Sequence, residues 1–414
     1  MTLTEPLSPI GAGDRIVAMD VLRGFALLGI LLMNIEAFVG PLFGALTGLD
    51  PTLRDADRTA DAAIYVLVQG KFYSLFSLLF GMGFAVMLAR ARAAGRGFAG
   101  VYLRRTAMLL LIGLAHALLL WSGDILTAYA LLAPALLLFR DTPAPRLPWW
   151  ALALYLLPVG LVLGLGALAS LAQLVPEAAA PMNQALAEQG RVMAEALADQ
   201  RRAYGDGTYA EAVARRAADL QLFLTHLASV MGWQIVGLFL LGAWFVRSGA
   251  IARPEAFEPF YWKLRWVALP VGLAMVLASC AITPYMDFTR SDLPVTAAMG
   301  LFTLGGTLMA LGYLAWILRG LRSSLAPRLM WLAPAGRMAL TNYLLQSLVC
   351  SWIFSGWGLG YFEQLPRAWQ VPFVFAFFVV QVVLSQAWLA RFRMGPMEWL
   401  WRAATYLRLP PMRR

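Results

Sequence analysis

Ten long apolar stretches divide this chain and constrain its fold more strongly than any other feature. A helix needs roughly 20 consecutive apolar residues to cross the hydrocarbon core of a bilayer, and most of these stretches reach that length. Only 14% of the 414 residues are charged, whereas soluble domains carry about 25%. We therefore predict an all-α, polytopic transmembrane bundle. The predicted spans are residues 16–38, 62–89, 104–121, 124–139, 148–175, 220–246, 264–285, 293–319, 334–357 and 369–390.

The second predicted span has two parts. Its continuous apolar part starts only at Phe72, after the polar sequence Gln69-Gly70-Lys71. The residues before Phe72 form either a tilted extension of the span or a separate helix at the membrane interface.

Basic residues are distributed unevenly between the loops, and this asymmetry predicts the orientation. With the N-terminus in the cytoplasm, the internal segments, beginning with Arg15, carry 21 basic and six acidic residues. The external segments carry nine basic and 14 acidic residues. Because basic residues resist translocation, both termini are expected in the cytoplasm. The same topology explains the formal net charge of +10, so nucleic acid is not expected as a partner.

Residues 1–414 are expected to form a single membrane domain, in which 176–219 is one long external segment. Apolar residues at helical spacing make this segment amphipathic, and residues 205–207 interrupt it. Thr208 then reads as an N-cap with Glu211 at the third helical position, a capping box from which a helix runs into span six. The segment is either an interfacial helical hairpin or a lid over an external site.

Inserting an ionisable residue at membrane depth costs roughly 2.5–3.5 kcal/mol on insertion scales, so each such residue is expected to have an interaction partner or a functional role. Near the cytoplasmic side this set comprises Asp20, Arg23 and Arg337. Asp20 and Arg23 are three residues apart, so they share a helix face and are expected to pair. The set is either an ion-pair cluster that ties helices together or a basic pocket for phosphate groups.

A second polar set is expected near the external side. Its centre is His116 and Asp124, which flank the short turn 121–123. So short a turn forces spans three and four into an antiparallel hairpin, in which the carboxylate can orient the imidazole as a general base. Alternatively, Asp124 caps its helix and His116 makes an interhelical hydrogen bond. Asn34 and Lys71 are assigned to the same external layer.

Span nine carries two more polar residues, Asn342 and Gln346. They are four residues apart and therefore lie on one helix face. They either hydrogen-bond a neighbouring helix or line a polar pocket. Cys280 and Cys350 lie in apolar runs, where a thiol behaves as a small hydrophobe. No spacing of cysteine and histidine residues indicates a metal site, so no metal is expected.

Three parts of the sequence resemble the YeiB-like family of bacterial inner-membrane proteins, also described as domain of unknown function 418. The first is 15–38, RIVAMDVLRGFALLGILLMNIEAF. The second is KFYSLFSLLFGMG at 71–83, followed by GLAHALLLWSGDILTAYALL at 113–132. The third comprises GRMALTNYLLQSLV at 336–349 and GPMEWLWRAATY at 395–406. The resemblance implies a multi-pass protein of the bacterial inner membrane.

The D-x-x-R-G core at Asp20, Arg23 and Gly24 is also distantly similar to a superfamily of transmembrane acyltransferases. This superfamily includes the heparan-glucosaminide N-acetyltransferase-like proteins and integral-membrane O-acyltransferases. The similarity implies a cytoplasmic acyl-CoA donor and an acceptor on the other side of the membrane. The O-acyltransferases have a histidine eleven residues after the motif arginine, where this chain has Asn34, so His116 is expected to replace it as the base.

We therefore predict a membrane acyltransferase that modifies an extracytoplasmic hydroxyl or amino group, with His116 and Asp124 as catalytic residues. Its expected partners are the lipid bilayer, acyl-CoA and the acceptor, and a homo-oligomer is left open. The alternatives are a transporter or exporter of a small or lipidic molecule, and a non-catalytic membrane scaffold that recognises partners through 176–219. The residues expected to bind substrate or donor are Asp20, Arg23, Asn34, Lys71, Arg337, Asn342 and Gln346.

Overall fold

The computed structural model describes residues 16–287 and 289–414, so Arg15 lies outside the described residues. The first half contains α1 (Val17–Val39), α2 (Asp55–Leu67), α3 (Lys71–Ala93), α4 (Ala99–Leu119), α5 (Leu126–Leu132), α6 (Leu147–Ala172), α7 (Pro176–Arg201) and α8 (Tyr209–His226). The second half contains α9 (Gly232–Arg247), α10 (Glu258–Lys263), α11 (Leu269–Ile282), α12 (Leu293–Gly320), α13 (Ala326–Met330), α14 (Ala333–Arg337), α15 (Ala339–Phe354), α16 (Arg367–Arg391) and α17 (Pro396–Tyr406). The prediction of an all-α bundle is confirmed.

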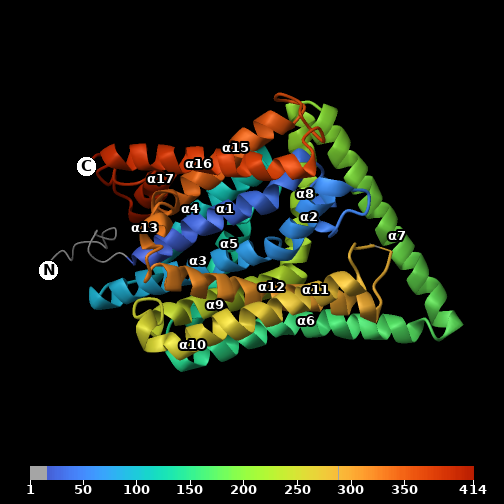
Figure 1. Cartoon of the computed structure of the whole chain (residues 1–414), viewed down its shortest axis with the longest axis horizontal. Helices are drawn as coiled ribbons and strands as arrows, with labels where there is room; N and C mark the ends of the chain where they lie inside the picture. The colour runs from blue at the N-terminus through green and yellow to red at the C-terminus, as the bar shows by residue number, and fades with distance from the viewer. Residues whose placement is uncertain (1–15, 288) are drawn as a thin grey trace.

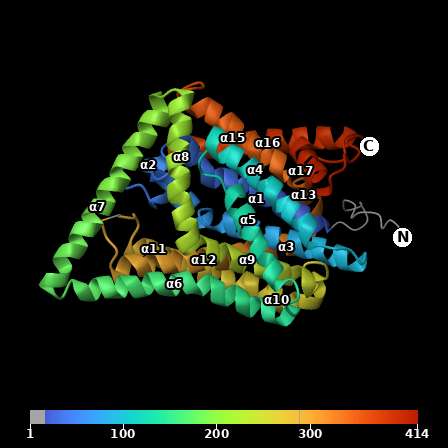
Figure 2. The ribbon, with the colours of Figure 1, turned by 180° about the vertical axis from the view of Figure 1, so that it is seen from behind.

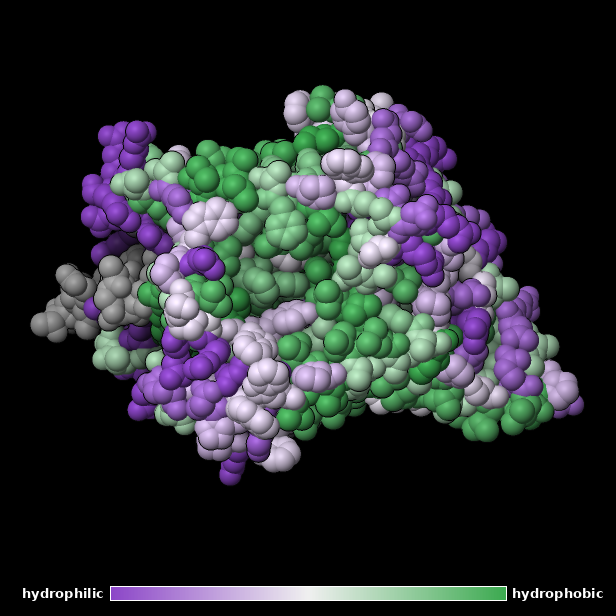
Figure 3. Space-filling model, in the orientation of Figure 1, coloured by the Kyte–Doolittle hydropathy of each residue, from purple (hydrophilic) through white to green (hydrophobic). Residues whose placement is uncertain are grey.

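An apolar band crosses the middle of one face of the molecule. Most of the long helices run along its long axis (Figure 1). Figure 3 shows hydrophilic surface at both ends of that axis and hydrophobic surface between them. Within the described residues, eight helices are long and apolar enough to cross a membrane, and the apolar helices Leu126–Phe139 and Ala339–Phe354 are shorter. Such a band suits lipid, where helices satisfy their own backbone polar groups. The protein is therefore a multi-pass membrane protein.

The second predicted span is broken where the sequence changes character. Gly70 separates α2 from α3 and has a φ of +80°, a left-handed conformation that glycine adopts without a steric penalty. α3 alone has 23 residues, enough to cross a bilayer. α2 is a separate helix that packs against α16.

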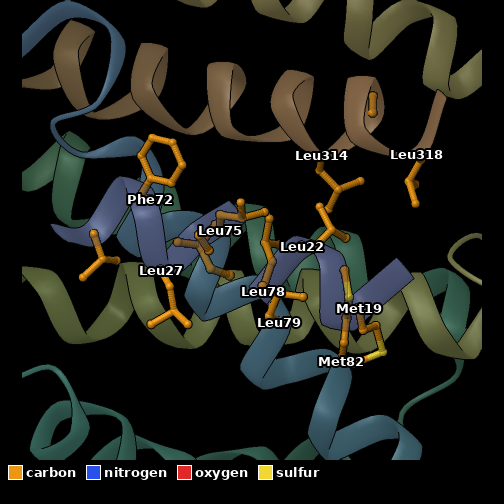
Figure 4. Close-up of a cluster of buried hydrophobic side chains, with 14 of the residues drawn as sticks. Met19, Leu22, Leu27, Phe72, Leu75, Leu78, Leu79, Met82, Leu314 and Leu318 are labelled. Carbon is orange, nitrogen blue, oxygen red and sulfur yellow. The ribbon is translucent and has the colours of Figure 1, made fainter. Parts of the chain in front are cut away.

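The core lies where α1, α3 and α12 meet (Figure 4). α3 also packs closely against α9, and glycines on both helices permit this approach. A Cβ atom on Gly81 would lie 1.9 Å from the carbonyl oxygen of Phe239, and one on Gly242 would lie 2.0 Å from that of Leu78. Small residues at such crossings let two backbones approach, as is usual between membrane helices. The labelled core side chains are Met19, Leu22, Leu27, Phe72, Leu75, Leu78, Leu79, Met82, Leu314 and Leu318.

The predicted external segment forms two helices at the end of the bundle remote from the C-terminus. α6, α7 and α8 make three sides of a triangle, with α7 running obliquely across that end (Figure 2). The predicted capping box is present, since the Thr208 hydroxyl accepts from the Glu211 amide and the Glu211 carboxylate accepts from the Thr208 amide. α8 continues through one π-helical turn, Leu227–Met231, into α9. The predicted continuation into span six is therefore confirmed.

Candidate functional site

A cavity of about 290 Å³ lies among α1, α3, α4, α5, α14, α15 and α17. One end of it, which we call the arginine end, is lined by five guanidinium groups and two carboxylates, those of Asp20 and Glu398. It belongs to the part of the bundle where α1 begins and the chain ends (Figure 1). The excess of positive charge suits a ligand with several negative charges. The five arginines are Arg23, Arg90, Arg105, Arg337 and Arg402.

Local packing brings the predicted inner residues together at this end. Asp20 accepts a hydrogen bond of 3.1 Å from the Arg23 guanidinium across one helical turn, which confirms the predicted pair. α14 lies directly against this turn, because a Cβ atom on Gly336 would lie 1.9 Å from the Asp20 carbonyl oxygen. A glycine is needed at that contact, and it places Arg337 beside the pair on the cavity wall.

The C-terminal helix α17 completes the arginine end. Glu398 accepts hydrogen bonds from the amide of Leu340, at 2.7 Å, and from the hydroxyl of Thr341, at 2.6 Å. It thereby satisfies donors at the start of α15, where a carboxylate is favourable. The Arg105 guanidinium lies over the ring of Trp401, 3.6 Å from its centroid. These contacts fix α17 against α4 and α15 and bring Arg402 to the cavity.

The cavity becomes apolar and aromatic away from the arginine end. α3 lines it from Arg90 to Phe76, two positions that are 14 residues apart and therefore roughly 21 Å apart along the helix at 1.5 Å per residue. We call the far end, lined by Tyr129 and Tyr343, the tyrosine end. The Tyr129 hydroxyl is hydrogen-bonded to Ser77, at 2.9 Å, and to a carbonyl oxygen of α3. An elongated ligand with a charged head and a less polar chain fits this arrangement.

His116 and Asp124 meet in the α4–α5 hairpin, as the short turn predicts. The His116 Nδ1 atom and the Asp124 Oδ1 atom are 2.8 Å apart, and both side chains are buried. The second carboxylate oxygen of Asp124 accepts from the Thr127 amide at 2.5 Å. Asp124 therefore contacts the imidazole and also accepts from the first turn of α5, so the contacts that both interpretations require are present. A catalytic role for the pair stays a prediction.

The histidine–aspartate pair does not itself line the cavity. It lies behind the tyrosine end, where the rings of His116 and Tyr343 have centroids 5.1 Å apart. Tyr343 is therefore the direct contact between the cavity and the pair. The arginines and the imidazole belong to one connected region, but Tyr343 stands between them.

α8, in the segment predicted to be external, holds the hairpin by hydrogen bonds. The carbonyl oxygen of Leu119, at the end of α4, accepts from the Tyr209 hydroxyl at 2.8 Å and from the Arg216 guanidinium at 3.0 Å. Asp219 accepts from the hydroxyl of Ser122, in the turn itself, at 3.2 Å. We call Tyr209, Arg216 and Asp219 the α8 clamp. It satisfies a carbonyl group that the end of a helix leaves without a partner in the helix.

The other predicted site residues lie elsewhere. Lys71 is fully buried, but its ammonium donates to the Tyr65 carbonyl oxygen and lies 4.5 Å from the ring centroid of Phe302. Asn34 is buried in α1. Neither Lys71 nor Asn34 lines the cavity.

The polar face of span nine holds two helices together. Asn342 donates to the hydroxyl of Ser385, and Gln346 donates to the side-chain oxygen of Gln381, each at 2.9 Å. Both bonds join α15 to α16, which is the interhelical alternative, and neither Asn342 nor Gln346 lines the cavity.

Several residues of interest were not among those expected from the sequence. Arg90, Arg105 and Arg402 look like ordinary topology-setting charges in loops and in the tail. At the other end, Arg367 forms ion pairs with Glu36, at 2.7 Å, and Asp61, at 3.0 Å. This buried cluster joins α1, α2 and α16. A signal for it in the sequence is Glu36, a carboxylate inside predicted span one, where an ionisable residue needs a partner.

No group of three or more His, Cys, Asp and Glu residues that could hold a metal ion occurs in residues 16–287 and 289–414. The candidate site is therefore built from arginine, tyrosine, histidine and carboxylate side chains.

Comparison with known proteins points to one family. A family model described as "Protein of unknown function (DUF418)" matches residues 245–408. Uncharacterized protein YxaH of Bacillus subtilis is 34% identical, and the alignment covers 98% of each chain. Uncharacterized protein YeiB of Escherichia coli is 32% identical, over 95% of this chain and 96% of that protein. A 39.9 kDa protein of Bacillus acidopullulyticus is 28% identical over 98% of each. No solved structure matches the chain.

Proposed function

The chain belongs to the YeiB-like (DUF418) family, and on that premise we propose that it is an acyl-CoA-dependent membrane acyltransferase. The acyl group would pass from a cytoplasmic acyl-CoA to a hydroxyl or amino group of an acceptor on the other side of a bacterial inner membrane. Both termini would lie in the cytoplasm, as the loop charges predict.

One observation carries the proposal: a single cavity has arginines at one end and Tyr343 at the other, and the Tyr343 ring contacts His116 of the histidine–aspartate pair. The arginine end offers five guanidinium groups for the phosphates of the donor. The apolar wall along α3 suits the narrow chain of the acyl-CoA molecule that joins its phosphates to the thioester. At the tyrosine end the thioester would lie beside Tyr343, whose ring contacts His116, and Asp124 would orient the imidazole of His116.

The proposal assigns a role to each part of the cavity. Arg23 and Arg337 bind donor phosphates together with the other arginines of that end. His116 removes the proton from the acceptor as the acceptor attacks the acyl carbonyl carbon, and Asp124 stabilises the resulting imidazolium. Lys71, Asn34, Asn342 and Gln346 take no part in this proposal. None of them lines the cavity, and the hydrogen bonds of Lys71, Asn342 and Gln346 go to groups other than His116 and Asp124.

Donor binding is the first test. Purified protein is titrated with acetyl-CoA and with longer acyl-CoAs while its thermal unfolding is followed, since a ligand that binds the native state raises the unfolding temperature. We expect stabilisation of the wild type and little stabilisation of Arg23→Ala. The matched control is Arg328→Ala, which removes an exposed arginine of α13 outside the cavity and should respond like the wild type. If no acyl-CoA stabilises the wild type, the proposal fails.

A transporter is the second candidate, and two interrupted helices favour it. α3 is preceded by a break at Gly70, and α15 by a break at Met338. Discontinuous helices of this kind surround the substrate sites of many transporters. Substrate flux into proteoliposomes that persists in a His116→Ala variant would favour transport over transfer.

A further inference from the structure

Three unpartnered polar atoms lie around the tyrosine end. They are the His116 Nε2 atom, the Thr127 hydroxyl and the Tyr343 hydroxyl, and none of them has a hydrogen-bond partner among the described residues. The side chains of His116, Thr127 and Tyr343 are 2%, 1% and 6% exposed, respectively. Buried polar groups are almost always paired, so three such atoms in one place need an explanation.

These three residues are neighbours in space. The His116 ring contacts the Tyr343 ring and is bonded to Asp124, which in turn accepts from the Thr127 amide. Thr127 also lies against α4, because a Cβ atom on Gly113 would lie 2.8 Å from the Thr127 hydroxyl oxygen. Leaving a buried donor or acceptor unsatisfied destabilises the folded protein. Such a cost is typical of a site that is completed by a ligand.

We propose that Tyr343 is a catalytic residue of the transfer, and that its hydroxyl donates a hydrogen bond to the acyl carbonyl oxygen. This inference rests on the proposed function and assigns a second group to the same site. Tyr343 is suited to the role because it lines the cavity and its hydroxyl donates to no acceptor, the backbone of Ile125 being a polar group close to it. Tyr129 lines the same end, but its hydroxyl is held by Ser77 and by a backbone carbonyl, so it is structural.

The proposed step is balanced as follows. The oxygen or nitrogen of the acceptor attacks the thioester carbonyl carbon and forms a new bond, while its proton moves to His116 Nε2. The carbonyl oxygen becomes an oxyanion, which the Tyr343 hydroxyl stabilises by its hydrogen bond. When the carbon–sulfur bond breaks, His116 returns the proton to the departing thiolate, so the products are acylated acceptor and free CoA.

Paired hydroxyl deletions test this assignment. Tyr343→Phe removes an unpaired hydroxyl, so thermal stability should be unchanged or slightly higher, whereas Tyr129→Phe removes a hydrogen-bonded hydroxyl and should be destabilised. Wild type and variants are reconstituted in liposomes with acetyl-CoA as the donor. Octyl glucoside and ethanolamine serve as hydroxyl and amino probes, and the released CoA thiol is measured. We expect kcat of Tyr343→Phe to fall by about 10²–10³-fold, as for loss of one oxyanion donor, with donor binding unchanged.

The outcomes separate the two proposals. A Tyr343→Phe variant with wild-type kcat, or one destabilised as much as Tyr129→Phe, would overturn the role of Tyr343 while leaving acyl transfer in place. A wild type that releases no CoA with either probe, and that no acyl-CoA stabilises, would overturn the proposed function and the role of Tyr343 with it.

Discussion

Replacing Asp219 by alanine is expected to release the external helices from the α4–α5 hairpin. The Asp219 side chain is only 1% exposed. It accepts from the hydroxyl of Tyr204 at 2.6 Å and from the side-chain amide of Gln200 at 2.9 Å. It also pairs with Arg215 at 2.6 Å and accepts from the hydroxyl of Ser122 in the hairpin turn. One carboxylate therefore holds α7, α8 and the hairpin together.

The size of the effect follows from that geometry. Removing one partner of a buried ion pair costs roughly 3–5 kcal/mol, and without Asp219 the Arg215 guanidinium keeps only a longer contact of 3.5 Å with the exposed carboxylate of Asp199. The lost contacts are confined to the external helices and the hairpin, so the cost should appear as local opening rather than as global unfolding. At 1.36 kcal/mol per factor of ten, opening should become about 10²–10⁴-fold more frequent.

Hydrogen exchange followed by mass spectrometry measures this opening directly. Peptides covering 196–219 and 116–124 should exchange faster in Asp219→Ala by the factor given above. Glu188→Ala is the control, because Glu188 pairs with Arg191 on the exposed surface of α7, where ion pairs contribute little. If 196–219 exchanges faster and 116–124 does not, then Asp219 does not position the hairpin. Unchanged exchange in both peptides would refute the buried ion-pair argument itself.

Three further changes are expected to affect stability. Gly81→Ala places a Cβ atom 1.9 Å from a carbonyl oxygen of α9 and should lower the free energy of unfolding by roughly 1–3 kcal/mol. Gly83→Ala is the control, because its Cβ atom would have no other atom within 4 Å and its stability should not fall. Denaturation of the two variants measures this difference. Arg367→Met leaves two outer carboxylates without their buried counter-charge, so it should lower stability by roughly 3–5 kcal/mol and the yield of folded protein with it. Thr208→Val removes the capping hydroxyl of α8 and should cost about 1 kcal/mol, seen as faster amide exchange in the first turn of that helix.

Much of the fold can be predicted from the sequence because a bilayer imposes a simple rule. A segment of about 20 apolar residues has few choices other than a membrane-spanning helix. The long helices accordingly match the predicted spans to within a few residues, as α1 and α12 do. The break at Gly70 is also visible as a polar interruption. The number of crossings and the cytoplasmic location of the termini remain predictions.

The parts of the site that could be predicted are those set by local geometry. Asp20 and Arg23 pair because three residues make almost one helical turn. His116 and Asp124 meet because a short turn leaves their helices no other arrangement. In both cases the contact depends on sequence spacing alone, so no knowledge of the tertiary structure is needed.

The rest of the site could not be predicted, because it depends on how distant helices pack. Arg105 and Arg402 are brought to one cavity by contacts between α4 and α17, nearly 300 residues apart. Tyr343 adjoins Asn342 in sequence but faces a different neighbour, His116. The sequence of a helical span shows which residues share a face. It does not show which other helix packs against that face, because this depends on the tertiary structure. The lack of hydrogen bonds to buried hydroxyls is visible only in three dimensions.

The position of Tyr343 also bears on how such a protein could keep a membrane sealed. An open, water-filled passage from the arginine end to the α8 clamp would let ions cross, and a bacterial inner membrane cannot tolerate such a leak. The cavity instead ends at Tyr343, with the buried pair of His116 and Asp124 behind it. In the proposed reaction only the acyl group has to pass this point, since the charged donor head stays among the arginines and the acceptor comes from the opposite side. A tyrosine that both closes the cavity and binds the carbonyl oxygen lets the acyl group cross while the barrier to ions remains.

Tyr343→Ala should therefore open a leak that Tyr343→Phe does not, because only alanine removes the ring. Proton flux into proteoliposomes under a pH gradient measures this difference, and equal flux for the two variants would show that the ring is not the barrier.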